Sequence, residues 1–291
     1  MGYADPVIGE TMLIRRLFTA AALAAVLLPI LFLGSAWWWA SVTLIFLLAA
    51  SWEWQRLIKP MPFQLSRVMT WPRGVVVMAV IGGLTLYGLF SNITPAYFDL
   101  FLYCAVSLFW IVAAIPLMRY QQVHRLSLWV VLFLLLAAWW AVIAARAIGI
   151  GYLLSIIFLV IAADSFAYFV GRAIGRHKLA PTISPGKTIE GVLGGAVGVL
   201  LTAAIFIQYV PWDNFFRLSW QKLGYFACLP WLTLLFFSVV GDLFESALKR
   251  AVNVKDSSQL LPGHGGVLDR IDALLPTLPL AMLITYFLNQ L

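Results

Sequence analysis

The stretch of sequence that decides the fold runs from residue 126 to residue 170 and reads LSLWVVLFLLLAAWWAVIAARAIGIGYLLSIIFLVIAADSFAYFV. Apolar side chains follow one another almost without interruption, and its charged residues are Arg146 and Asp164. An α-helix needs about 20 mostly apolar residues to cross the hydrocarbon core of a bilayer, whereas the strands of a membrane barrel alternate apolar and polar positions. The stretch therefore predicts two consecutive membrane-spanning helices, over residues 126–146 and 148–170.

The rest of the chain has the same character. Of its 291 residues, 63% are hydrophobic and 11% are charged, and the mean hydropathy of +0.96 excludes an ordinary soluble protein. We predict an all-α polytopic integral membrane protein with about nine transmembrane helices and a polar cavity on the cytoplasmic side. The candidate spans are 17–34, 36–53, 74–91, 98–118, 126–146, 148–170, 188–210, 225–245 and 273–289.

The spans predict a simple domain organisation. We expect one transmembrane domain over residues 12–291, after a leader or disordered N-terminus at residues 1–11. The motifs and the resemblance described below imply that its first part, 12–146, acts mainly as scaffold or dimer surface and that 147–291 is catalytic. Gly34-Ser35 predicts a tight hairpin between the first two spans. Cys104 and Cys228 lie within apolar runs and provide neither a disulfide framework nor metal-ligand spacing.

The distribution of Lys and Arg predicts the orientation in the membrane. When the N-terminus is placed in the cytoplasm and the chain changes sides through nine spans, 16 of the 19 basic residues fall on the cytoplasmic side. The exceptions are Arg146, Arg217 and Lys222. This bias explains most of the net charge of +7 without a nucleic-acid partner. We expect a bacterial-type inner or plasma membrane, with the N-terminus and the active site cytoplasmic.

Several acidic residues lie within or at the ends of the apolar runs, where an unpaired charge costs several kcal/mol. They are Glu53, Asp164, Glu190, Asp242 and Glu245. Asp242 and Glu245 are three residues apart, as are Asp269 and Asp272, so each pair shares a helix face. Two helices entering from the same side would bring four carboxylates to one point. Oxygen ligands at that density suit Mg²⁺ rather than zinc.

Residues that bind phosphate surround these acids in the sequence. Carboxylates for Mg²⁺ beside cations for phosphate oxygens are the recurring arrangement of phosphoryl and nucleotidyl transfer. The glycines of PGHGG, residues 262–266, would let backbone N–H groups approach a phosphate. The candidate phosphate-binding residues are Arg172, Arg176, Lys178, Ser184, Lys187, Thr188, Ser246, Lys249, Arg250, Lys255 and Ser257.

The segment SALKRAVNVKDSSQLLPGHGGVLDRID, residues 246–272, resembles the signature of the phosphatidate cytidylyltransferases, also called CDP-diacylglycerol synthases. Upstream, ADSFAYFVGR and ISPGKTIEG also resemble segments of this family, although SFAY replaces a Thr-Gly that many members carry before the alanine. The N-terminal half is similar in hydropathy and number of spans only. The matching positions are Ser246, Lys249, Arg250, Lys255, Asp256, Ser258, Pro262, His264, Gly265, Gly266, Asp269, Arg270 and Asp272.

The resemblance implies an enzyme that condenses CTP with phosphatidic acid, giving CDP-diacylglycerol and pyrophosphate. It implies a helical membrane protein that acts as a homodimer among membrane phospholipids, with Mg²⁺ as cofactor and K⁺ as a second cation. Carried over by position, Asp242, Asp269 and Asp272 would hold the metal.

The remaining roles follow from charge and position. The triphosphate and the leaving pyrophosphate would meet cations at Lys187, Lys249, Arg250, Lys255 and Arg270, and the lipid phosphate would meet Arg172 and Lys178. His264 would bind phosphate, orient a ligand carboxylate, or cap the loop. Asp256 would position Lys255. Ser184, Thr188, Ser246, Gly265 and Gly266 would line the substrate site, and Asp164 and Glu190 would support its wall or reach the nucleotide.

Two alternatives stay open from the sequence. A related CTP-using membrane enzyme, such as a polyprenol or phytol kinase or a cytidylyltransferase for another lipid phosphate, would share the metal site and differ in the lipid acceptor. A secondary transporter would use acids at the membrane midplane for ion coupling. The acids here crowd one side and one half of the chain, which favours the enzyme.

Overall fold

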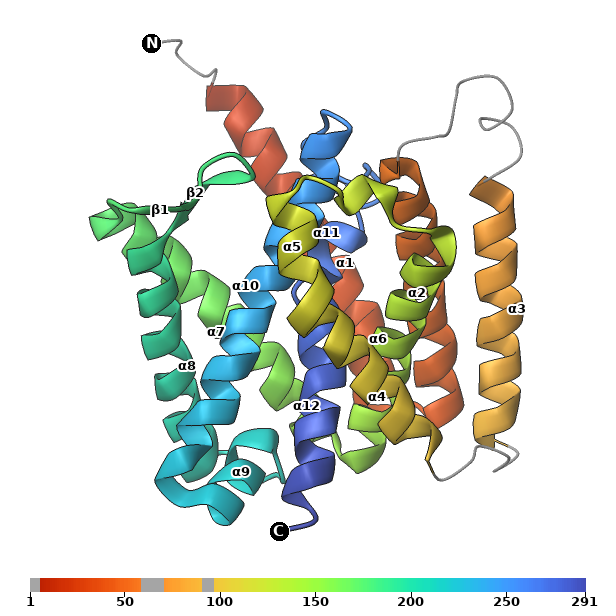
Figure 1. Cartoon of the computed structure of the whole chain (residues 1–291), viewed down its shortest axis with the longest axis vertical. Helices are drawn as coiled ribbons and strands as arrows, with labels where there is room; N and C mark the ends of the chain where they lie inside the picture. Colours follow the sequence, from red (N-terminus) through yellow and green to blue (C-terminus); the bar gives the residue numbers. More distant parts are fainter. Residues whose placement is uncertain (1–5, 59–70, 91–96) are drawn as a thin grey trace.

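The computed structural model describes residues 6–58, 71–90 and 97–291, and within them the protein is an all-α membrane protein with one small hairpin (Figure 1). Its elements are α1 (Pro6–Leu33), α2 (Ala36–Leu57), α3 (Trp71–Phe90), α4 (Phe98–Leu108), the π-helical turn Phe109–Ala113, α5 (Ala114–Arg119), the 3₁₀ turn Val123–Arg125, α6 (Leu128–Ile148), α7 (Ile150–Ile174), β1 (Lys178–Ala180), β2 (Ser184–Thr188), α8 (Ile189–Tyr209), α9 (Phe215–Leu223), the 3₁₀ turn Gly224–Ala227, α10 (Cys228–Ala251), α11 (Leu268–Ile271) and α12 (Leu274–Leu288).

The predicted spans fall on helices to within about two residues at their ends, and residue 91 lies outside the described residues. In the part of the chain that the structure describes, six helical segments are long and apolar enough to cross a membrane: Phe98–Arg119, Leu128–Ile148, Ile150–Ile174, Ile189–Tyr209, Phe215–Ala251 and Leu268–Leu288. The helices α1, α2 and α3 are not among them, so nine crossings stay a prediction. Residues 6–11, expected to be leader or disordered, form the first turns of α1. Residues 1–5 lie outside the described residues.

The hairpin predicted between the first two spans is confirmed. Only Gly34 and Ser35 separate α1 from α2, and the Ser35 hydroxyl caps α2 by accepting from the amide of Trp38. Arg146, at the end of α6, donates to the carbonyls of Leu31 and Gly34 at 3.1 and 2.6 Å. These bonds satisfy carbonyls that the end of α1 leaves without a helical partner. Arg146, which the charge count places on the side of the membrane with few basic residues, therefore joins the hairpin to α6.

The helices α7 and α8 pack against each other along their length, and small residues make this possible. A Cβ atom on Gly195 would lie 2.9 Å from the carbonyl oxygen of Ala163 in α7, and one on Gly191 would lie 2.8 Å from that of Ala167. Membrane helices rely on such close backbone approach because lipid tails provide no hydrophobic drive for association. The pair forms the side of the bundle that carries the β hairpin (Figure 1).

The segment between α7 and α8, expected to be a loop, contains the antiparallel hairpin of β1 and β2. Lys178 pairs with Thr188 and Ala180 pairs with Ser184. Thr188 then caps α8, because its buried hydroxyl accepts from the amide of Gly191 at 3.1 Å. The hairpin therefore places Lys187 directly before Thr188, the N-cap residue of α8. Figure 1 places it at the end of the bundle where α1 begins, opposite the end where α12 finishes.

The glycine packing generates a test. Gly195→Leu should reduce the stability of the protein by about 1–3 kcal/mol, because the new side chain has no room against the backbone of α7. Thermal unfolding in detergent, followed by tryptophan fluorescence, measures the change. Val197→Leu is the matched control, since Val197 lies on the same helix and is 53% exposed. Equal melting temperatures for the two variants would contradict this account of the helix pair.

Candidate functional site

The segment 246–272 is anchored by a carboxylate from the other half of the chain. Glu53 in α2 is fully buried, and its two oxygens accept from the amides of Val267 and Leu268 at 3.0 and 2.6 Å. They also accept from the hydroxyls of Ser257 and Ser258 at 3.2 and 2.5 Å. The two amides and the Ser258 hydroxyl compensate the desolvation of this carboxylate, together with the single hydroxyl proton of Ser257, which Glu53 shares with Asp269. In the sequence Glu53 is only one of several acids in apolar runs. In the structure it accepts hydrogen bonds from four residues of the segment 246–272 and so holds this loop in place.

Asp269 is held in the same loop by a second set of bonds. Its Oδ2 atom accepts from the amide and hydroxyl of Ser257, both at 2.9 Å, and from the amide of Gly266 at 2.8 Å. Its Oδ1 atom accepts from Lys249 Nζ at 2.6 Å. Lys249 also pairs with Glu245 one turn earlier on α10. These three side chains are 7, 12 and 3% exposed in the order Asp269, Lys249, Glu245, so they form a buried ionic knot.

The glycines of the loop serve this packing. A Cβ atom on Gly266 would lie 2.0 Å from Ser257 Oγ and 2.5 Å from Glu53 Oε1. Gly265 has a φ of +84°, in the left-handed region that glycine adopts without strain. The amides of Gly266, Val267 and Leu268 all donate to protein carboxylates. Within PGHGG, residues 262–266, the amide of Gly266 therefore helps to close the loop, and a contact between this segment and a phosphate stays a prediction.

A second ion pair is more open. Lys187 Nζ lies 2.6 Å from Asp242 Oδ2, and these side chains are 23 and 30% exposed. Asp242 also accepts from the Ser246 hydroxyl at 3.3 Å. The carboxylate of Asp272 interacts electrostatically with Asp242, Lys187 and Lys249, and that of Asp164 with Asp242 and Lys187. Three acids and one lysine from α7, β2, α10 and the start of α12 thus meet beside the knot. We call Lys187, Asp242, Asp272 and Asp164 the open cluster.

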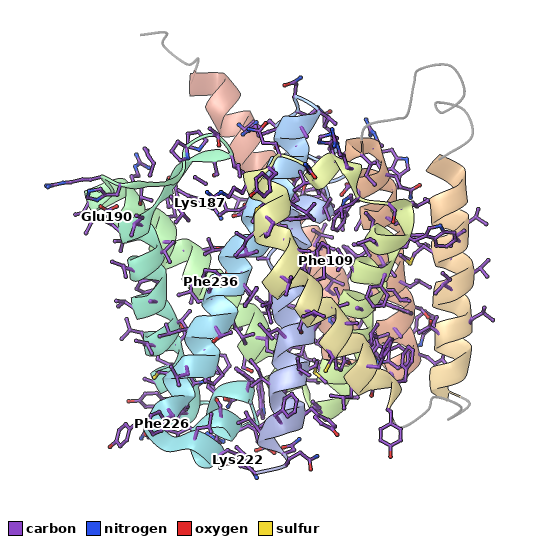
Figure 2. The ribbon with its side chains drawn as sticks, in the orientation of Figure 1. Phe109, Lys187, Glu190, Lys222, Phe226 and Phe236 are labelled. Carbon is purple, nitrogen blue, oxygen red and sulfur yellow. The ribbon has the colours of Figure 1, made fainter. Side chains whose placement is uncertain are left out.

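Other candidates lie at the same end of the molecule but have different partners. Glu190 accepts from the amides of Arg176 and His177 and from the ring of His177, at 2.6 Å, so it secures the turn after α7. Arg172 donates to the hydroxyl of Tyr168 at 3.0 Å. Thr188 is occupied as a helix cap. Figure 2 shows Lys187 and Glu190 near the hairpin and Lys222 and Phe226 at the opposite end of the bundle.

The remaining positions surround the anchored loop. Arg250 donates to the carbonyls of Ile183 and Val254, at 3.4 and 3.2 Å, and so joins α10 to the hairpin turn. Arg270 donates twice to the carbonyl of His264, at 3.1 and 2.5 Å. The Nδ1 atom of His264 is buried without a described partner. The residues Lys178, Lys255 and Asp256 are exposed, Ser184 is half-buried, and none of these four contributes a side chain to the knot or the open cluster.

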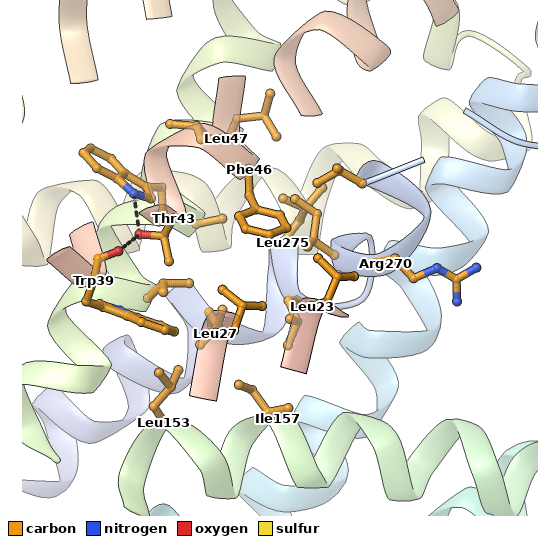
Figure 3. A pocket seen from close by; sticks show the side chains of 18 of the residues that line it. Leu23, Leu27, Trp39, Thr43, Phe46, Leu47, Leu153, Ile157, Arg270 and Leu275 are labelled. Atoms are coloured by element: carbon orange, nitrogen blue, oxygen red, sulfur yellow. Dashed lines mark hydrogen bonds between the residues drawn. The ribbon is translucent and has the colours of Figure 1, made fainter. Parts of the chain in front are cut away.

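A cavity of about 270 Å³ lies on the other side of α12 (Figure 3). Of its described lining residues only Arg270 is charged, and Figure 3 shows the guanidinium pointing away from the cavity. Thr43 is engaged with the carbonyl of Trp39 at 2.7 Å and the indole of Trp139 at 3.0 Å. Trp39 Nε1 is a single buried donor in this lining without a described partner, and the rest of the wall is almost entirely apolar. Such a wall does not suit phosphate groups, so the open cluster is the better candidate for the site.

The donor set of the open cluster fits Mg²⁺ in one of its usual binding modes. Among the described residues no three His, Cys, Asp or Glu side chains are grouped closely enough to hold an ion by themselves. Mg²⁺ commonly binds through one or two carboxylates, several waters and substrate phosphates. Asp242 and Asp272 supply two such carboxylates. The oxygens of Asp269, expected as a third ligand, are already engaged by Lys249, Ser257 and Gly266.

The role of Glu53 can be tested through stability. Glu53→Ala should lower the melting temperature in detergent by several degrees, because it leaves buried amides and hydroxyls without an acceptor at about 1–3 kcal/mol each. Arg56→Ala, an exposed position one turn along α2, is the control and should change little. If the two variants have the same melting temperature, the loop is held by other contacts.

Comparison with known proteins agrees with this geometry. Residues 14–288 match the model of the Cytidylyltransferase family. A Haemophilus influenzae protein named phosphatidate cytidylyltransferase is 51% identical over 131 residues, 45% of this chain and 44% of that protein. Proteins of the same name from Staphylococcus haemolyticus and Bacillus subtilis are 43 and 44% identical over 138 and 133 residues, which cover 47 and 45% of this chain and 50 and 46% of theirs.

The aligned region of the chain therefore spans about half the length of these curated relatives. The family model extends much further, from the first helix to the last. It includes Glu53 in α2 as well as the ionic knot and the open cluster. The chain belongs to the cytidylyltransferase family.

Proposed function

We propose that this protein is a CTP:phosphatidate cytidylyltransferase, which condenses CTP with phosphatidic acid to give CDP-diacylglycerol and pyrophosphate in phospholipid biosynthesis. The observation that carries the proposal is the open cluster, where Lys187 and Asp242 are paired at 2.6 Å yet partly exposed, with Asp272 beside them. The names of the relatives support the choice of substrates.

The reaction needs little covalent chemistry from the protein. A phosphate oxygen of phosphatidic acid attacks the α-phosphorus of CTP in line, an O–P bond forms, and the bond to the bridging oxygen of pyrophosphate breaks. The nucleophile is already an anion, so no strong general base is required. Rate enhancement then comes from positioning and from neutralising the phosphate charge. Lys187 is suited to this because an incoming phosphate can replace Asp242 as its partner.

Mg²⁺, when bound, would neutralise phosphate oxygens and orient the leaving group. Asp242 and Asp272 would hold it, while Asp164 adds negative charge to the same space. Asp269 and Lys249 act differently in this proposal: they keep the loop and α10 in register so that Asp272 faces Asp242. A second cation such as K⁺ stays an expectation from the family resemblance, as does a homodimer.

The proposal includes an orientation. Lys187 of the open cluster lies at the end of the bundle where α1 begins (Figure 2), and the sequence predicts that end to be cytoplasmic. CTP is water-soluble and phosphatidic acid is held in the leaflet, so a reaction between them belongs at this boundary. Arg172 and Lys178, which stand outside the cluster, are placed to meet anionic lipid head groups.

The first test compares two lysines. In mixed micelles with CTP, phosphatidic acid and Mg²⁺, Lys187→Gln should lower kcat/KM by about 100-fold or more, the usual effect of removing one preorganised charge-stabilising donor. Lys222→Gln, at the opposite end of the bundle, should retain wild-type activity (Figure 2). Formation of radiolabelled CDP-diacylglycerol is the readout. Wild-type product from diacylglycerol or a polyprenol, and none from phosphatidic acid, would select the related kinase instead.

The second test concerns the cation. Asp272→Asn should raise the Mg²⁺ concentration needed for half-maximal activity by about tenfold or more and lower the maximal rate, because one of two carboxylate ligands is lost. Asp213→Asn, an exposed acid in the α8–α9 connection, is the matched control. An unchanged Mg²⁺ dependence in Asp272→Asn would remove this residue from the metal site.

A further inference from the structure

A second cavity, of about 340 Å³, opens at the same end of the bundle as Lys187. Three parts of the chain form it: the turn that follows α5, the turn between β1 and β2, and the C-terminal end of α10. Its described lining residues are Met118, Gln121, Val123, His124, Thr182, Ile183, Ala247, Arg250, Ala251 and Asn253. In contrast to the apolar cavity beside α12, polar and apolar side chains share this wall. Cavities of this size and composition are typical of small-ligand sites.

The polar groups of this cavity are held in place, and one of them lacks a partner. Gln121 and Asn253 both have left-handed backbones, with φ of 54 and 58°, and their amides donate to Met118 and Arg250 at 3.1 Å each. The Nδ1 atom of His124 is buried and has no hydrogen-bond partner among the described residues. This atom is closed to solvent, so the groups that can face a ligand are the side-chain amides of Gln121 and Asn253, which belong to exposed residues.

The cavity is lined by two elements that also carry residues of the open cluster. On α10, Arg250 follows Asp242 by eight residues, a rise of about 12 Å along the helix. On the hairpin, Ile183 directly precedes β2, which carries Lys187. Arg250 joins the two elements by donating to the Ile183 carbonyl. An extended ribose and triphosphate can bridge such a separation, so one nucleotide could reach both places.

We propose that this cavity binds the cytosine base of CTP, an inference that rests on the proposed function and names a subsite for it. A cytosine edge presents an amino donor and ring and carbonyl acceptors, and the side-chain amides of Gln121 and Asn253 offer both kinds of partner. Met118, Val123 and Ala247 provide apolar contacts for the ring faces. Arg250 then positions the hairpin against α10 at the wall of the base site.

Chemical labelling tests the subsite without relying on turnover. In a background of Cys104→Ser and Cys228→Ser, Thr182→Cys introduces one thiol at the cavity wall. CTP should slow its reaction with a maleimide by fivefold or more, whereas inorganic tripolyphosphate, which lacks the base and ribose, should not. Lys222→Cys is the control and should be unaffected by either. Equal protection by CTP and tripolyphosphate, protection by short-chain phosphatidic acid alone, or no protection would each overturn the proposal.

Kinetics provide the second measurement. Gln121→Leu should raise the KM for CTP by tenfold or more, because a buried polar base edge loses its partner, while the KM for phosphatidic acid and inhibition by pyrophosphate stay unchanged. Gln122→Leu, its exposed neighbour, is the matched control. An active wild type with unchanged KM values in Gln121→Leu overturns the base site and leaves the proposed function standing. A wild type that forms no CDP-diacylglycerol refutes the function, while labelling still reports on the cavity.

Discussion

The buried carboxylate of Glu53 is the constraint on which the site depends. A charge removed from water must be given hydrogen-bond donors, and in a chain this apolar the donors must come from the protein itself. Glu53 obtains them from the serines and amides of the segment that carries Asp269 and Asp272. Satisfying one acid in α2 therefore fixes the fold of a loop about two hundred residues away in the sequence. The N-terminal part therefore helps to set the position of the segment 246–272.

The two sets of ion pairs differ in their exposure to solvent. Lys249 lies between Glu245 and Asp269, nearly closed to solvent, where breaking the knot would leave an uncompensated buried charge. Lys187 and Asp242 are paired as closely but stay partly open, so a phosphate or a cation can exchange for either partner. The same residue types thus occur in two settings: the closed set holds the backbone, and the open set is the one that we propose to receive substrate. In that proposal the mixed cavity beside Arg250 extends the site toward the nucleoside.

Much of this could be predicted because its physical cause is local. Runs of apolar residues require helices in a bilayer, so the helix positions follow directly from the sequence, and Gly34-Ser35 could only make a tight connection. The signature of residues 246–272 identifies the family because its residue types and spacing are specific. The grouping of carboxylates near α10 and α12 could also be predicted from the sequence, because a three-residue spacing places two acids on one helix face.

Which partner each charged side chain meets was beyond the reach of the sequence. Asp269, predicted from the sequence as a metal ligand, meets Lys249, Ser257 and Gly266 in the structure, and Gly266 of PGHGG lies against Glu53. Nothing near His124 in the sequence indicates that it shares a cavity with Asn253. The sequence by itself determined a membrane-embedded helical chain of this family, because hydropathy and motif are local properties. Only the tertiary structure decided which charges are closed and which are open, because pairing depends on contacts between segments far apart in the chain.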